Sequence, residues 1–276
     1  IIAIRLTPLL TIVMGSLLVL RALWSVLASR KIKWKEFKSL DLDLLDMVLL
    51  ISGGFVVLGE VISPLFSITI VELVSSNLST ELTQSLKIFV GYLFMAIPPL
   101  FIIYYQIKSF DKKFLFRKDY FQFNFLPIKD SFFQGFKGFL MIIPFVLLVS
   151  LVMNLLFDNQ NGSNPLLEIV LNNNNYFSFV LLFLTTTLIA PLFEEVIFRG
   201  VLLPILSREF GIILGITISA FIFALAHLSI SEMPPLFVLG IGLGITRLIS
   251  GRLSSSVIMH SLWNGMTFLN LFLLRT

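Results

Sequence analysis

The chain has 276 residues, of which 57% are hydrophobic and only 13% are charged. Soluble domains carry about 25% charged residues, so this composition excludes a water-soluble globular domain and indicates an integral membrane protein. The net charge of +4 is too small to suggest nucleic-acid binding, and the absence of cysteine excludes disulfides, thiolate metal sites and a cysteine nucleophile.

Long, continuous apolar runs follow one another along the chain. Such runs are typical of membrane-spanning helices and differ from the alternating strands of a membrane barrel. We therefore predict an all-α, polytopic membrane helix bundle with about eight transmembrane helices. We expect the second run, which contains Glu60 and Pro64, to bend or to divide into a span and a shorter interfacial helix. The predicted spans are 3–28, 45–73, 87–106, 134–157, 176–192, 212–228, 235–250 and 257–274.

The connections between these runs alternate in positive charge. Lysine and arginine gather in the first and third connections and are absent from the second and fourth, while the later connections carry few charges. Positive residues remain on the cytoplasmic side of a membrane. We therefore predict that the odd-numbered loops are cytoplasmic and that both termini lie outside. We expect the first run to stay in the protein as a span, because it is too long for a signal-peptide core.

Two carboxylates and an arginine follow the fifth run, in the sequence APLFEEVIFRG at 190–200. On a helix, residues four apart share a face and adjacent residues do not. Glu195 and Arg199 are therefore predicted to form an ion pair, whereas Glu194 shares its face with Phe198 and has no such partner. The alternative is a cytoplasmic helix end with solvated charges.

The two histidines of the chain, His227 and His260, both fall in late apolar runs. Either one alone is compatible with a hydrogen-bonded packing residue. Asn264 follows His260 by four residues and is expected on the same helical face, and polar groups at membrane depth face a cavity or a partner. A carboxylate, two imidazoles and an amide are the groups needed to activate water and to stabilise an oxyanion.

Three short motifs contain these residues in order: EEVIFRG, FALAH and HSLWN. Together they resemble the motifs of the CAAX prenyl protease and bacteriocin-processing family, also called the Abi family, whose members are intramembrane proteases of the glutamate type. The resemblance covers roughly 176–274. We accordingly predict an N-terminal membrane region over 1–130, with no recognised motif, and a CAAX-protease-like domain over 131–276.

The resemblance implies a role for each motif residue. Glu194 and His227 resemble the pair that activates water, and His260 and Asn264 resemble the pair that binds the oxyanion. Glu195 and Arg199 resemble a supporting ion pair, and Phe223 resembles a packing residue. The implied function is a membrane endopeptidase whose active site opens to the cytoplasmic side and which uses no cofactor.

The resemblance also implies the partners: the lipid bilayer and a peptide or protein substrate at the membrane, which is prenylated for some family members. Nucleic acid is not expected as a partner.

Other functions were weighed against the residues. The motifs of serine, aspartyl and His-Glu-x-x-His intramembrane proteases are absent. Zinc held by Glu194, His227 and His260 is chemically possible, because a carboxylate and two imidazoles form a hydrolytic zinc set. A non-catalytic scaffold or regulator of a partner protein would keep the same helices. A transporter with Glu60 as its intramembrane charge is a further alternative, although no related halves are evident.

Overall fold

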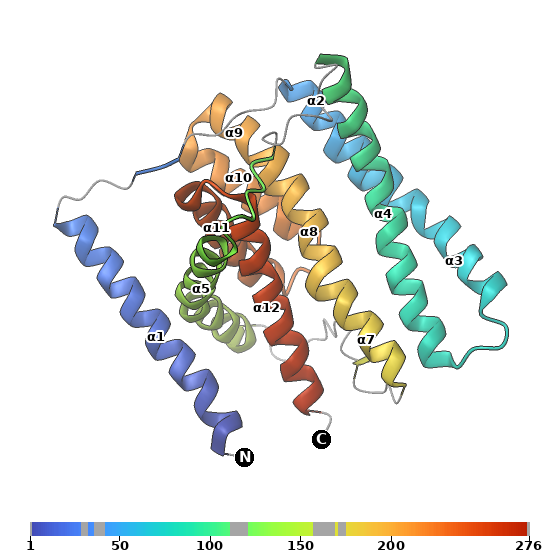
Figure 1. Ribbon diagram of the computed structural model, residues 1–276, viewed down its shortest axis with the longest axis horizontal. Helices are drawn as coiled ribbons and strands as arrows, with labels where there is room; N and C mark the ends of the chain where they lie inside the picture. Colours follow the sequence, from blue (N-terminus) through green and yellow to red (C-terminus); the bar gives the residue numbers. More distant parts are fainter. Residues whose placement is uncertain are drawn as a thin grey trace. The chain divides into compact units, whose positions relative to one another are not determined.

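A computed structural model describes residues 2–28, 33–35, 42–110, 121–156, 169–170 and 175–274. These residues form helices and connections without any strand, which confirms the all-α prediction (Figure 1). Much of the predicted third and fourth loops lies outside the described residues. Within these described ranges, six helical segments are long and apolar enough to cross a membrane, namely Leu9–Leu27, Leu44–Val74, Thr80–Lys108, Ile128–Leu156, Tyr176–Phe210 and Met233–Ser250. The chain is thus a multi-pass integral membrane protein.

Every predicted span corresponds to a helical segment. Four of them are single helices: α1 (Ile2–Leu27), α4 (Thr80–Phe110), α5 (Ile128–Leu156) and α11 (Met233–Ser250). The predicted sixth and eighth spans are the helices α10 (Ile212–Leu225) and α12 (Leu253–Leu274), which are not among these six segments. α10 has only 14 residues.

The second run does not divide as expected. It comprises α2 (Leu44–Val48), the π-helical segment η1 (Leu49–Ile62) and α3 (Ser63–Val74), which together make one helical span. In a π-helix each amide bonds to the carbonyl five residues earlier, and the amide of Ser63 bonds to Leu58 in this way. Pro64 lies in the first turn of α3, where a missing amide hydrogen is tolerated, so the proline does not interrupt the span.

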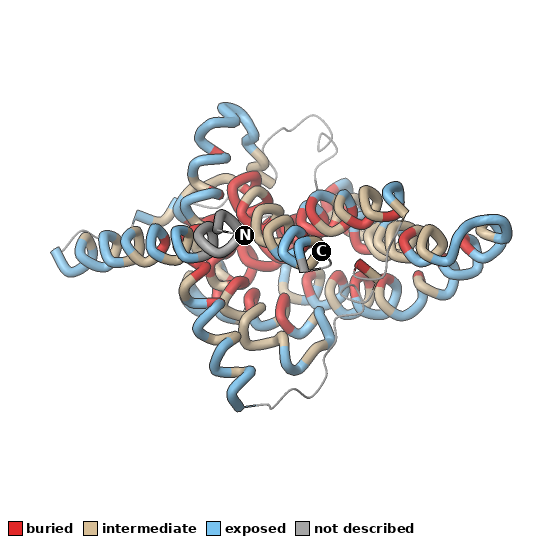
Figure 2. The backbone as a smooth tube through the Cα atoms, turned by 90° about the horizontal axis from the view of Figure 1, so that it is seen from below, coloured by how far each residue is buried: buried red, intermediate tan, exposed pale blue. Residues whose placement is uncertain are grey.

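The fifth run continues well beyond its predicted end at residue 192. Its helical rod contains α7 (Tyr176–Leu184), η3 (Thr185–Ile189), α8 (Ala190–Glu195), η4 (Val196–Leu202) and α9 (Leu203–Phe210). Every residue from 193 to 206 is buried, including the charged ones (Figure 2). The charges that ended the apolar run in the sequence are therefore inside the protein, and the alternative of solvated charges at a helix end is wrong.

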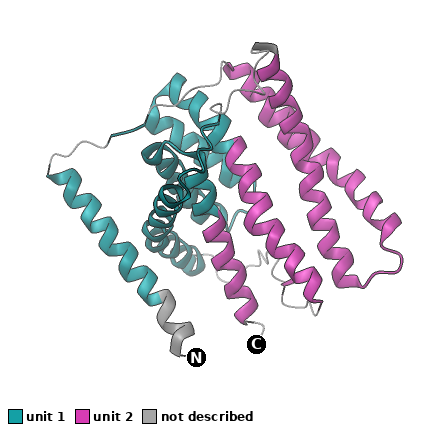
Figure 3. Ribbon diagram, in the orientation of Figure 1, with its two compact units in different colours: residues 1–38, 121–162, 198–260 teal, residues 39–120, 163–197, 261–276 magenta. Residues whose placement is uncertain are grey.

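The chain forms two compact units, each built from segments that are distant in sequence (Figure 3). Unit 1 comprises residues 1–38, 121–162 and 198–260, and unit 2 comprises residues 39–120, 163–197 and 261–276. The chain crosses between the units within η4 and within α12. The predicted domain boundary at residue 130 stays a prediction.

Helices in unit 1 approach one another closely through small residues. α11 packs against α5 and α10, α10 packs against α9, and α1 packs against α5. A Cβ atom on Gly240 of α11 would lie 2.9 Å from the Cβ atom of Ala220 on α10. Small residues at such crossings are typical of membrane helix pairs, because burial of apolar surface alone does not hold helices together in lipid.

In unit 2, α4 is the central helix. It packs against η1, α3, α7 and η3. A Cβ atom on Gly54 would lie 2.7 Å from the side chain of Ile102, and one on Gly59 would lie 3.0 Å from the carbonyl oxygen of Met95. Small residues therefore let η1 pass close to α4 at this crossing.

Candidate active site

Phe223 is the contact point of the candidate site in unit 1. Its side chain is fully buried near the end of α10. The centroid of its ring lies 4.8 Å from that of His227 and 5.6 Å from that of His260, both in edge-on geometry. The packing residue of the second motif therefore touches both imidazoles. Sequence spacing could relate Phe223 to His227, but only the fold shows its contact with His260.

His227 lies in the turn that follows α10 and is exposed. Its Nδ1 atom lies 2.8 Å from the carbonyl oxygen of Phe223. A carbonyl oxygen only accepts hydrogen bonds, so this contact requires Nδ1 to carry a proton. In the neutral ring, Nε2 then keeps its lone pair and is the atom that can accept a proton.

Arg199 is buried within the rod on the unit 1 side. Its Nη2 atom donates a hydrogen bond of 3.1 Å to the carbonyl oxygen of Gly240. Its guanidinium carbon also lies 4.4 Å from the centroid of the Phe223 ring, within the range of a cation–π interaction. Arg199 thus ties the glutamate-bearing rod to the α10–α11 pair.

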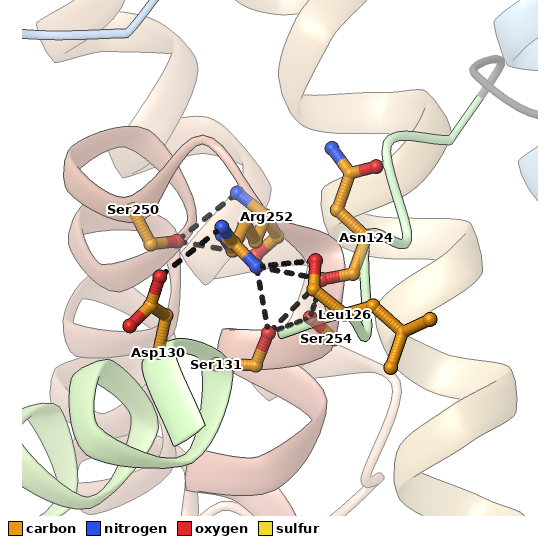
Figure 4. A network of polar contacts seen from close by, with 7 residues as sticks. All are labelled: Asn124, Leu126, Asp130, Ser131, Ser250, Arg252 and Ser254. Carbon is orange, nitrogen blue, oxygen red and sulfur yellow. Dashed lines mark hydrogen bonds and ion pairs between the residues drawn. The ribbon is translucent and has the colours of Figure 1, made fainter. Parts of the chain in front are cut away.

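His260 is carried by the first part of α12, which a polar network holds in place (Figure 4). Arg252 precedes this helix, and its Nη1 atom donates hydrogen bonds of 3.0 Å to the carbonyl oxygens of Asn124 and Leu126. Ser254 donates to the carbonyl oxygen of Asn124 and contacts Ser131 at 2.9 Å. The segment before α5 is therefore bonded to the start of α12, two turns before His260.

We expect Arg252→Ala to loosen this network. The substitution removes two charge-assisted hydrogen bonds and an ion pair of 3.6 Å with Asp130. The free energy of unfolding should fall by about 1–3 kcal/mol, because the guanidinium is partly solvated. Thermal unfolding in detergent measures it. Arg208→Ala is the control, since Arg208 is exposed and its pair with the adjacent Glu209 is exposed as well. Equal melting temperatures for the two variants would contradict this role.

Asn264 forms its contact in unit 2. Its Nδ2 atom donates a hydrogen bond of 2.9 Å to the carbonyl oxygen of Thr186 in η3. The π-helical bond from Ala190 goes to Thr185, and the next residue, Pro191, has no amide hydrogen to donate to Thr186. The proline thus leaves a backbone acceptor in the rod, which the Asn264 amide satisfies. Pro191 was the sequence signal for this acceptor, and sequence reasoning missed it.

Glu194 and Glu195 belong to α8 in unit 2 and are both buried, with exposed fractions of 7% and 0%. Unit 1 therefore brings together Arg199, Phe223, His227 and His260, and unit 2 holds Glu194, Glu195 and Asn264. The meeting of the two groups in one site stays a prediction, as does the Glu195–Arg199 ion pair. Among the described residues, no three His, Asp or Glu side chains form a metal-binding group.

Glu232 was not singled out from the sequence. It lies directly before α11, is half-buried, and interacts electrostatically with His227. Burial raises the pKa of the Glu232 carboxyl, and the nearby His227 partly opposes this shift. The sequence signal was the acidic residue in the SEMPP stretch that joins two apolar helices. Glu232 is therefore a carboxyl group beside a predicted catalytic imidazole.

Comparison with known proteins identifies one family and one curated relative. Residues 176–266 match the model of the family described as type II CAAX prenyl endopeptidase Rce1-like. The chain is also similar to the membrane-embedded CAAX protease MroQ of Staphylococcus aureus (strain USA300), with 28% identity over 134 residues. This alignment covers 46% of the chain and 53% of the relative, so the chain spans about half the length of the curated relative that it matches. No solved structure matches the chain.

The matched region contains all three motifs singled out in the sequence, with Glu194, Phe223, His227, His260 and Asn264 among its residues. Residues 176–266 are therefore similar to the CAAX protease family.

Proposed function

We propose that the chain is a CAAX-protease-like intramembrane endopeptidase. Glu194 and His227 activate a water molecule, and His260 and Asn264 stabilise the oxyanion that forms. The observation that carries this proposal is the contact of one buried ring, Phe223, with both imidazoles inside the region that matches the family. Burial of Glu194 within a membrane-spanning rod adds support, because an ionisable residue at such a position is most often functional.

Glu194 is the general base in this mechanism. Its carboxylate takes a proton from water while the water oxygen attacks the carbonyl carbon of the peptide. The tetrahedral intermediate then collapses, the C–N bond breaks, and the leaving nitrogen receives the proton. His227 assists this transfer through Nε2, because its Nδ1 proton is held by the carbonyl of Phe223. A positioned acid–base group of this kind contributes about 10²–10⁴ in rate.

Asn264 and His260 supply hydrogen-bond donors to the oxyanion. An asparagine amide has two N–H donors, and one of them is used by the carbonyl of Thr186. That bond fixes the plane of the amide and leaves the second N–H as the donor for the developing negative charge. Pre-oriented donors of this kind act without reorganisation during the reaction.

We expect Asn264→Ala to lower kcat by about 10²–10³-fold while leaving measurable turnover. Cleavage of a quenched peptide by purified protein gives this value. Asn270→Ala, at the far end of α12, is a matched control, because it removes the same group from the same helix. An undiminished kcat for Asn264→Ala would remove this residue from the oxyanion site.

The substrate in this proposal is a peptide or protein at the membrane, lipidated or not, that enters from the cytoplasmic side. No resident cofactor takes part. Cleavage of peptides with and without a prenyl group tests whether the substrate is lipidated. The same assay with and without a chelator tests whether a metal takes part. Loss of activity with chelator and its recovery with zinc would make the protein a metalloenzyme. Failure of the purified protein to cleave any peptide would favour a scaffold that regulates a partner.

A further inference from the structure

Glu60 is a carboxylate within the span Leu44–Val74, and the proposed mechanism does not use it. An ionisable side chain inside a membrane helix is costly and faces a polar partner. Glu60 is half-buried and lies near the end of η1, on the segment that crosses α4. The groups on α4 at this crossing therefore identify its surroundings.

The crossing is fixed on both sides of Tyr92. On one side, Gly59 lies against the carbonyl of Met95. On the other, a Cβ atom on Gly91 would lie 3.9 Å from the hydroxyl of Ser67, a buried residue of α3. Tyr92 lies between Gly91 and Met95 on α4 and is half-buried. Tyr92 therefore lies on α4 at the crossing with the segment that carries Glu60.

The same segment contacts the helix of the proposed general base. The rings of Phe55 in η1 and Phe193 in α8 stack with centroids 6.0 Å apart. Glu60 follows Phe55 by about one turn, and Glu194 is the residue after Phe193. The Tyr92 phenol interacts electrostatically with the carboxylates of both Glu194 and Glu60. Three elements of unit 2 thus bring one phenol and two carboxylates together.

We propose that Tyr92 is a positioning residue for Glu194. The Tyr92 hydroxyl donates a hydrogen bond to the Glu194 carboxylate and fixes the orientation of that carboxylate toward water. This inference deepens the proposed function and rests on it. A tyrosine hydroxyl has one proton to donate, and hydrogen bonds to an ionised carboxylate are about twice as strong as neutral ones. Tyr92 lies outside the region that matches the family, so the N-terminal half of the chain contributes to the site.

Tyr92→Phe tests this role because it removes only the hydroxyl. We expect kcat to fall by about 10–10²-fold, since loss of orientation at a reacting group has effects of this size, with KM and the melting temperature little changed. Tyr105→Phe is the matched control, because it makes the same change at an exposed position of α4. A kcat equal to that of the control, or a loss confined to KM, would overturn the positioning role.

A double-mutant cycle with Glu194→Asp separates positioning from a purely structural effect. The shorter aspartate withdraws the carboxylate from the hydroxyl. Tyr92→Phe should therefore lower kcat by a smaller factor in Glu194→Asp than in the wild type. Independent structural effects would instead combine additively. Additive losses would therefore contradict the proposal.

Crosslinking tests the placement without any activity, and the chain has no cysteine to interfere. A short bis-maleimide should join Tyr92→Cys to Glu194→Cys. It should not join Tyr105→Cys to Glu194→Cys, because Tyr105 lies about 20 Å further along the helix. No crosslink in the first pair would overturn this inference and leave the proposed function standing. A crosslink in the first pair, combined with no peptide cleavage by the wild-type protein, would instead locate the failure in the proposed function.

Discussion

Glu194→Gln is expected to abolish peptide cleavage. Glutamine keeps the size of the side chain and its ability to accept a hydrogen bond, but it cannot take a proton from water. A general base contributes up to about 10⁴-fold in rate, so turnover should fall by roughly that factor and approach the uncatalysed background. Initial rates of cleavage of a quenched peptide by purified protein provide the measurement.

Glu209→Gln is the matched control for this variant. Glu209 lies on the same helical rod, but it is exposed and pairs only with the adjacent Arg208. Its substitution should leave cleavage within about twofold of the wild type, as is usual for exposed charges. Substantial activity in Glu194→Gln would defeat the assignment of the general base and direct attention to Glu232, the carboxyl group near His227.

Arg199→Ala is expected to destabilise the protein as well as to inactivate it. The side chain is fully buried, donates to the carbonyl of Gly240, and lies over the ring of Phe223. Loss of one partner of a buried ion pair costs roughly 3–5 kcal/mol. We therefore expect a low yield of folded protein in detergent and a clearly lowered melting temperature. Arg208→Ala, at an exposed position of the same rod, should change neither property.

The predicted pair with Glu195 can be tested in the same series. If Glu195 and Arg199 form an ion pair, Glu195→Gln should recover part of the stability lost in Arg199→Ala, because it removes the carboxylate left without its partner. An additive loss in the double variant would contradict the ion pair between Glu195 and Arg199. A melting temperature equal to the wild type in Arg199→Ala alone would contradict a stabilising role for Arg199.

The sequence predicted the helical runs well because their signal is local. A span of about 20 apolar residues can be recognised from its own sequence alone. Each of the eight predicted runs is helical in the structure. The fifth run was cut short at residue 192 because its charges were read as the end of the apolar segment. The burial of Arg199 depends on neighbours such as Gly240 and Phe223, which are distant in sequence and cannot be seen in a hydropathy pattern.

The candidate site was predictable only in part, for a similar reason. Motif spacing singled out Glu194, His227, His260 and Asn264, and their chemistry follows from their side chains. The contact of Phe223 with His260 depends on how α10 packs beside α12. The acceptor of Asn264 depends on a π-helical turn followed by Pro191. Tyr92 could not be found from the motifs, because it lies in a region without any.

π-helical turns lie on either side of α8. Because of them, the spacing of residues in the motif does not by itself determine the direction of their side chains. A π turn holds about one residue more than an α turn, so η3 sets the angle at which every later residue leaves the rod. A substitution that made Thr185–Ile189 α-helical, without loss of a residue, would leave the sequence EEVIFRG unchanged. It would nevertheless rotate both glutamates by about 100°, the angle of one residue in an α-helix. A relative with an intact motif and an α-helical turn in place of η3 would therefore present its glutamates in a different direction.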